Sequence, residues 1–250
     1  MNSQRFSQAS LDFIVRASKQ KKKEWLDKHR SEYEDVLVSP MRELMEKVSI
    51  ALRPHAPGYR FPKRNHARIR RGAEGAEAHG PFRDWVGVSV SRDSESRYEG
   101  NPNLYFHFAE GREEILSAGG LYVPSADQTK HIRSWIDKDP SLLEGLLEDK
   151  KFGKHFPKGL GDERKLKTKP RDYPQDHPRI EWLKLSGWYV WKPYSKKEFF
   201  SKNFSELLIA DWAEVLRLNK ILDIYISSWP GSKSIDILPL ARPFQDDWVD

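Results

Sequence analysis

Cysteine is absent from the 250 residues of this chain. That absence excludes disulfide bonds, a thiolate nucleophile, cysteine-ligated zinc and iron–sulfur clusters. The sequence also lacks the HExxH, GxSxG and GxxxxGKS/T motifs, and it shows no paired-carboxylate or histidine-cluster motif. We therefore expect no dedicated metal site, and the sequence leaves the identity of any cofactor open.

Long apolar runs are missing as well. No stretch is long enough to span a bilayer, and residues 1–6 carry no apolar signal core. We therefore expect a cytoplasmic protein with no membrane partner. Hydrophobic residues make up only 38% of the chain and charged residues 32%, but nine Trp, nine Tyr and twelve Phe supply large buried areas. This balance predicts an aromatic core beneath a charged surface.

Positive charge exceeds negative charge, with a formal net charge of +6. Such an excess favours nucleic acid, phosphorylated ligands or acidic surfaces as partners, although the same charge also serves solubility. The densest basic run is residues 60–71, RFPKRNHARIRR, which contains no acid. Burying an unpaired charge costs several kcal/mol per ion. This run is therefore expected to face water or an anion.

Apolar residues at helical spacing predict helices towards both ends of the chain. Ser7 or Ser10 is expected to cap the first helix, and Pro40 suits the first turn of a later one. Another helix is expected to begin at Ser125, and residues 203–227 form a final amphipathic helix. The helix after Pro40 has an apolar face made of Met41, Leu44, Met45, Val48 and Leu52.

The middle of the chain changes to a period of two, which is typical of strands. The alternating residues are Val86, Val88 and Val90, then Leu104, Phe106 and Phe108. Residues 91–102 read as a long hairpin loop between these runs. Residues 115–123 predict a third strand that Gly119-Gly120 breaks, and residues 188–191 predict a further strand. The first three of these strands have short connections, which imply an antiparallel meander.

Together these patterns predict an α+β fold, in which an antiparallel meander packs with N-terminal and C-terminal helices. We expect a single domain over residues 7–229. Residues 230–250 lack a regular period and are predicted to form an extended or loosely packed tail. The oligomeric state has no signature in the sequence.

Several ordered blocks of sequence resemble a known family. They are Glu24-Trp25-Leu26, Tyr33-Glu34, Arg60-Phe61-Pro62-Lys63, residues 119–124 (GGLYVP) and residues 171–178 (RDYPQDHP). In this order, from about residue 7 to about residue 227, they are similar to the bacterial and fungal family called domain of unknown function 2461. The resemblance implies no particular reaction.

The family pattern contains Arg-Phe-Ser-Lys-Asp followed by Ser-Pro-Tyr-Lys-Thr. This chain keeps Arg60 and Lys63 at matching positions, so the resemblance supports both as site residues. It departs from the pattern with Pro62 and Arg64. An ungapped reading places Arg68 at the tyrosine and Ile69 at the second lysine, whereas a slip of one residue places Arg68 or Arg70 at that lysine.

An anion site is the leading hypothesis for the basic run. If residues 66–71 are extended, Arg68 and Arg70 point to one face, and with Arg60 and Lys63 they can form a guanidinium fork for phosphate or carboxylate. The alternative is a solvated edge strand whose charge blocks unwanted pairing. Trp25 is expected either in the core or as one wall of the pocket, where it could stack on an arginine or a ligand ring.

Three further features are candidates for the site. His107 alternates away from the apolar face of its strand, so it is a candidate acid–base group or ligand donor. Gly119 and Gly120 permit either a bulge or close approach of a ligand, or simple steric relief beneath a bulky aromatic side chain. Asp176-His177 could act as a metal or acid–base pair, but the commoner outcome for such a pair is structural, with Asp176 closing the turn and His177 packing before a helix.

Nucleic-acid binding is the first alternative function. Residues 150–171 carry nine basic residues and interleaved phenylalanines, and they could act together with residues 60–71 through phosphate contacts and base stacking. A mobile basic surface loop is the simpler reading of this segment. The second alternative is a hydrolase or transferase that uses His107 or the Asp176-His177 pair.

Overall fold

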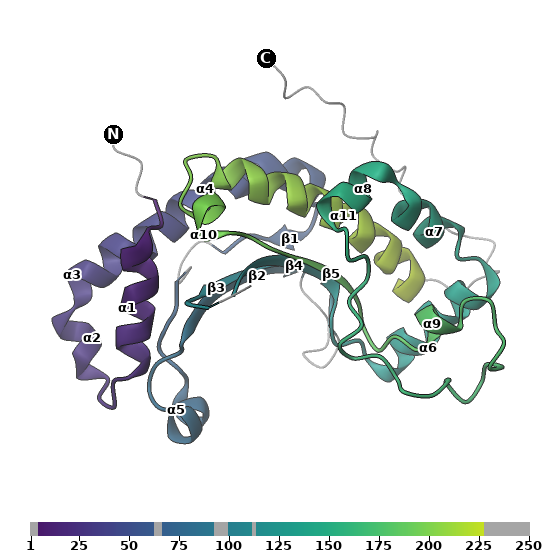
Figure 1. The fold of residues 1–250 in the computed structure, drawn as a ribbon, viewed down its shortest axis with the longest axis horizontal. Coiled ribbons are helices and arrows are strands. Elements are labelled where there is room, and N and C mark those ends of the chain that lie inside the picture. Colours follow the sequence, from purple (N-terminus) through teal and green to yellow (C-terminus); the bar gives the residue numbers. More distant parts are fainter. Residues whose placement is uncertain (1–4, 63–66, 93–99, 112–113, 228–250) are drawn as a thin grey trace, which may run out of the picture.

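A five-stranded antiparallel sheet forms the centre of the fold (Figure 1). The structure is a computed structural model that describes residues 5–62, 67–92, 100–111 and 114–227. The strands are β1 (Tyr59–Arg60), β2 (Trp85–Arg92), β3 (Asn103–Ala109), β4 (Ile115–Leu121) and β5 (Trp188–Pro193). Their order in the sheet follows the chain, so the predicted antiparallel meander is confirmed.

Helices precede and follow the meander, which confirms the α+β prediction. Before the sheet lie α1 (Gln8–Ser18), α2 (Glu24–Lys28), α3 (Arg30–Tyr33), the π-helical turn η1 (Glu34–Val38), α4 (Ser39–Leu52) and the 3-10 turn η2 (Arg53–His55). Ser7 occupies the N-cap of α1, and Pro40 lies in the first turn of α4, both as predicted.

The remaining helices occur between or after the strands. They are α5 (Ala73–His79), α6 (Ala126–Lys138), α7 (Ser141–Glu148), α8 (Lys150–His155), α9 (Ile180–Leu183), α10 (Lys196–Phe199) and α11 (Phe204–Ser227). Ser125 caps α6 as predicted, with its side chain accepting the backbone N–H of Gln128. Among the described residues, no helix combines the length and apolarity needed to cross a membrane.

One face of the sheet carries the core. The alternating valines of β2 and the Leu104, Phe106 and Phe108 side chains of β3 are all buried beneath α11 and α4 (Figure 1). The helix α11 also bonds to the sheet backbone, because Trp212 and Asn219 donate side-chain N–H groups to carbonyls of β3 at 3.3 and 3.0 Å. Burial of these aromatic and branched side chains is the main driving force that holds α11 on the sheet.

The predicted break at Gly119-Gly120 is wrong, because both glycines are paired within β4. Gly119 is opposite Leu104 on one side, and Gly120 has a φ of 116° that favours glycine. A Cβ atom on Gly119 would collide with Val215 of α11. Both glycines therefore continue the strand, and Gly119 lets the helix α11 approach the sheet closely, whereas Gly120 makes room for the backbone of β5.

The other face of the sheet is left partly open. Its floor is made of Trp85, Gly87 and Ser89 of β2, Tyr105 and His107 of β3, Leu116 and Ala118 of β4, and Trp191 of β5. All of these are half-buried or exposed, whereas the opposite face is buried. The ribbon is an arch with this face on its concave side, between α1 and α5 at one edge and residues 156–178 at the other (Figure 1).

The second basic segment runs along the β5 edge of the sheet. It begins with α8, which Asp149 caps, and this short helix around Gly153 was not predicted. Backbone bonds then tie Gly161 to Tyr189 of β5 and Leu166 to Lys184. The segment is therefore attached to the sheet as one wall of the concave face. The predicted tail, residues 230–250, lies outside the described residues, so the domain boundary at residue 229 stays a prediction.

Candidate anion-binding site

A cavity of about 480 Å³ opens on the concave face at the start of β2. Trp85, Tyr105 and His107 lie on its floor, and Val15 of α1 borders it on one side. The acids at its margin are Asp84, Glu110 and Glu114. Aromatic and polar groups thus converge in a volume that suits a small ligand.

His107 lines this cavity and carries a buried ring nitrogen. Its Nε2 atom has no hydrogen-bond partner among the described residues, and the Glu114 carboxylate lies 3.6 Å away. Burial lowers the pKa of His107, and Glu114 only partly opposes that effect. Neutral imidazole is therefore favoured at neutral pH.

Arg83 provides positive charge beside the cavity. Its guanidinium lies 4.6 Å from the ring centre of Trp85, in a cation–π contact. Burial and the nearby charges of Arg68 and Arg71 lower the pKa of Arg83, so the three cations are neighbours. No ion pair joins Arg83 or Arg68 to a carboxylate within the described ranges. None of the three cations is among the residues that line the cavity, so they can neutralise an anion that extends beside it.

Some arginines of the basic run form ion pairs and hydrogen bonds within the fold, and others face the solvent. Arg70 donates to Asp27 at 2.7 Å and to the backbone oxygen of Lys23 at 3.0 Å, which fastens the run to α2. Arg71 bonds the Phe82 carbonyl at 3.0 Å and lies 3.4 Å from Asp84. The run contains no acid in its sequence, but in the folded structure Asp27 and Asp84 lie next to its arginines.

Arg68 is the predicted ligand residue that lies near Arg83. The run is extended around Ile69, where Arg70 forms a bridge with Phe82 and the Ile69 side chain is buried, as the alternation predicted. Arg68 is exposed on the other side, and its Nε donates to the Arg70 carbonyl at 3.1 Å. The terminal nitrogens of its guanidinium are therefore the ones left to meet an anion.

The other predicted ligand residues lie elsewhere. Arg60 pairs with Ser91 at the far end of β2, about 20 Å along the strand from Trp85 at 3.3 Å per residue. Lys63 lies outside the described residues. Trp25 stacks on His29 at 4.2 Å and meets Phe82 edge-on, in a packing position behind the basic run.

Gly119 and Gly120 are buried beneath α11 and against β5, away from the cavity. The steric-relief reading describes Gly119 well, although the side chain above it is Val215 and not an aromatic. Neither glycine is therefore part of the site described here.

The Asp176-His177 pair does not form a dyad. His177 Nδ1 accepts the backbone N–H of Arg179 at 3.0 Å, and Nε2 lies 3.1 Å from Asp137 of α6. Both ring nitrogens are thereby used to hold the loop, and Asp176 is exposed. Of the three acid–base candidates, only His107 lines the cavity.

A second pair of a cation and an aromatic lies at the opposite edge of the concave face. Lys158 Nζ is 3.8 Å from the ring centre of Trp191, and Arg164 lies 5.2 Å from that of Tyr122. Both cations belong to the basic segment 150–171. Sequence reasoning missed Arg83 and Trp191 as site residues, whereas Lys158 belongs to the basic segment that it had marked as a candidate nucleic-acid surface. Strand alternation could have identified Trp191, but no local signal marks Arg83.

A separate ionic cluster is buried between α8, β5 and α11. Asp211 is fully buried and accepts hydrogen bonds from Lys192 at 2.9 and 3.0 Å and from the Tyr194 hydroxyl at 2.5 Å. His155 Nδ1 approaches the same carboxylate at 2.5 Å. Burial and the Asp211 charge raise the pKa of Tyr194 well above its usual range. Each of these polar side chains has a partner within the cluster, so the cluster acts as a clamp that joins α8, β5 and α11.

Metal binding has no support in this arrangement. Within the described parts of the chain, no three His, Asp or Glu side chains are grouped so that they could hold an ion. Only one histidine lines the cavity together with the acids. A closed zinc site needs more nitrogen or sulfur ligands than that.

The comparisons with known proteins give one match. A family model described as a conserved hypothetical protein (DUF2461) matches residues 9–220, from α1 to most of α11. No curated protein and no solved structure matches the chain. The matched region includes both edges of the concave face. Because the family model covers far more than half of the chain, the resemblance seen in the sequence is confirmed: the chain belongs to the DUF2461 family.

Proposed function

We propose that this protein binds an anionic, phosphorylated ligand that carries a planar ring, in the cavity on the concave face of the sheet. Arg68 and Arg83 hold the phosphate, and Trp85 and Tyr105 contact the ring. The observation that supports the proposal best is the pairing of Arg83 with Trp85 beside a second cation. Neither arginine has an acidic partner among the described residues.

The chemistry of these groups fits such a ligand. A guanidinium presents donors in a planar fork that matches two phosphate oxygens, and two neighbouring guanidiniums that repel one another gain most from a shared anion. Aromatic floors suit planar rings, and about 480 Å³ lies within the usual range of ligand sites. His107 and Glu114 can hydrogen-bond polar groups on the ring edge.

Thermal unfolding tests the proposal. Adenosine triphosphate, adenosine monophosphate and inorganic phosphate are the phosphorylated probes, and adenosine is the uncharged control. A probe at 100 times its Kd is expected to stabilise the fold by about 2.7 kcal/mol, which raises the Tm by about 5–10 °C.

Two variants and one control locate the effect. Arg83→Met and Arg68→Met each remove one cation from the cavity rim, whereas Lys130→Met removes one exposed cation from α6. We expect the first two variants to lose most of the stabilisation and the third to keep it. The proposal fails if no phosphorylated probe raises the Tm, or if the rim variants respond like the control.

A further inference from the structure

The two cation–aromatic pairs stand at opposite edges of one continuous floor. Arg83 and Trp85 lie at the β2 edge, and Lys158 and Trp191 lie at the β5 edge. We propose that the concave face is a track for single-stranded nucleic acid that runs between these pairs. The inference rests on the proposed function, because the first nucleotide of the strand occupies the cavity described above.

The register of the sheet makes the floor uninterrupted. Tyr105, Ala118 and Trp191 are direct neighbours in one cross-strand row, and Ser89 continues this row on β2. Each of these side chains is half-buried or exposed. Because the Ala118 side chain is small, it leaves room above the sheet between Tyr105 and Trp191. A planar base can therefore approach the sheet between Tyr105 and Trp191.

The separation of the two pairs is too long for one nucleotide. Trp85 and Trp191 are three strands apart and about four residues apart along the strands, which places them on the order of 20 Å apart. At a rise of 3.4 Å per stacked nucleotide, this distance corresponds to about six nucleotides. A short oligonucleotide can contact both pairs, whereas a mononucleotide reaches only one.

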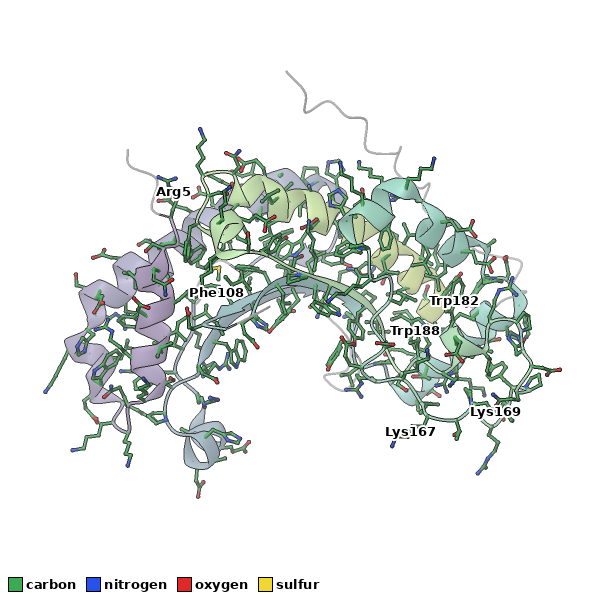
Figure 2. All side chains as sticks on the ribbon, viewed as in Figure 1. Arg5, Phe108, Lys167, Lys169, Trp182 and Trp188 are labelled. Carbon is green, nitrogen blue, oxygen red and sulfur yellow. The ribbon has the colours of Figure 1, made fainter. Side chains whose placement is uncertain are left out.

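The wall beside β5 supplies further charge along the same edge. Arg164 lies over Tyr122, and Lys167 and Lys169 extend from the lower end of this wall (Figure 2). The acid Glu163 is held by the Tyr189 hydroxyl. Cations that follow a row of accessible aromatic rings bind single strands through phosphate contacts and base stacking, and the rings of this floor are half-buried. Bases in a duplex are already stacked and cannot reach such a floor.

The test compares oligonucleotides with a mononucleotide on the full chain. Fluorescence anisotropy measures the Kd of labelled oligouridylate and oligothymidylate of about eight nucleotides, within the site sizes of single-strand binders. Adenosine triphosphate is titrated as the mononucleotide probe. We expect at least one oligonucleotide to bind about tenfold more tightly than adenosine triphosphate, with an affinity that falls as salt is raised.

Variants at the two edges of the concave face distinguish binding along the track from binding in the cavity alone. Trp191→Ala is expected to weaken oligonucleotide binding about tenfold, because base stacking on an aromatic ring contributes about 1–3 kcal/mol per base. Lys158→Met is expected to weaken it less and to lower the salt slope by about 0.7. Neither change should alter binding of adenosine triphosphate. Arg83→Met should weaken both ligands, and Lys130→Met neither.

Each contrary result has its own meaning. The track is overturned, while the cavity proposal stands, if the oligonucleotides bind no more tightly than adenosine triphosphate. The same conclusion follows if Trp191→Ala and Lys158→Met leave the Kd of the oligonucleotides unchanged. If Arg83→Met leaves binding of adenosine triphosphate unchanged, the cavity proposal fails, and the track fails with it. Lys158→Met changes only an exposed side chain, so its result stands even if Trp191→Ala loses folded structure, which circular dichroism detects.

Discussion

Arg70 forms an ion pair with Asp27 at 2.7 Å, across 43 positions of sequence, and the same guanidinium bonds the backbone oxygen of Lys23. Arg70 therefore holds the basic run against α2. Its neighbour Arg68 makes only a local bond to the Arg70 carbonyl. Two arginines separated by one residue therefore have different roles.

This difference predicts opposite effects for two equivalent substitutions. Arg70→Met should lower the free energy of unfolding by about 1 kcal/mol, because an exposed ion pair and one hydrogen bond are lost. Arg68→Met should change stability by less than about 0.5 kcal/mol but weaken binding of adenosine triphosphate. Urea unfolding and ligand titration of both variants measure the two effects. Loss of binding in Arg70→Met, with stability unchanged, would contradict the assignment.

The buried carboxylate of Asp211 is expected to be essential for stability. Asp211→Asn leaves Lys192 without its anionic partner inside the protein, and breaking a buried pair costs about 3–5 kcal/mol. Urea unfolding should show a loss of about that size. The control Glu46→Gln changes an exposed acid on α4 and should stay within about 0.5 kcal/mol of the parent protein. Equal stability of the two variants would show that the clamp contributes nothing.

Gly119→Ala should destabilise the fold through one methyl group. The new Cβ would collide with Val215 and with the Asn103 carbonyl, and overpacking of this kind costs about 1–3 kcal/mol. Gly145 of α7 is the matched control, since it is exposed and a Cβ there meets no described atom within 4 Å. Gly145→Ala should stabilise by about 0.4–1 kcal/mol. Thermal unfolding that moves both Tm values in the same direction would refute the packing argument.

His107 is expected to make folding stability depend on pH. Burial lowers the pKa of His107 more than the Glu114 carboxylate raises it, so below about 6.5 the unfolded chain binds this proton more readily than the folded one. Stability is therefore complete above that pH and falls as the pH decreases. His107→Gln removes this contribution.

Urea unfolding from pH 7.5 to 5.0 measures this dependence. The difference in free energy of unfolding between the parent protein and His107→Gln should change across that interval, with the parent losing more stability towards low pH. Because the other seven histidines are common to both proteins, their titration cancels in the difference. Parallel curves would show that His107 titrates as it does in the unfolded chain.

Much of the fold could be predicted because hydrophobic periodicity is a local property. The alternation of Val86, Val88 and Val90 identified the buried face of β2, and helical spacing identified the core side of α4. The same alternation placed His107 on the face away from the core. The break at Gly119 was predicted wrongly, because the glycine is required by Val215 of a helix almost a hundred residues later.

The candidate site was harder to predict, because charge neutralisation is not local. The basic run contains no acid, yet Asp27 and Asp84 reach Arg70 and Arg71 in space. Arg83 carried no local signal, since it becomes a candidate only when Arg68 lies beside it without an acidic partner.

By itself, the sequence determined which side chains line the core, because periods of 2 and 3.6 state directly which residues share a face. The short connections between β2, β3 and β4 also determined that these three strands are neighbours, whereas the places of β1 and β5 were not predicted. Only the tertiary structure decided which cations are used in ion pairs and which remain for a ligand. It also brought Lys158 to Trp191 and Arg83 to Trp85 at the two edges of one sheet. The physical reason is that electrostatic and cation–π energies depend on distance in space, which sequence separation does not report.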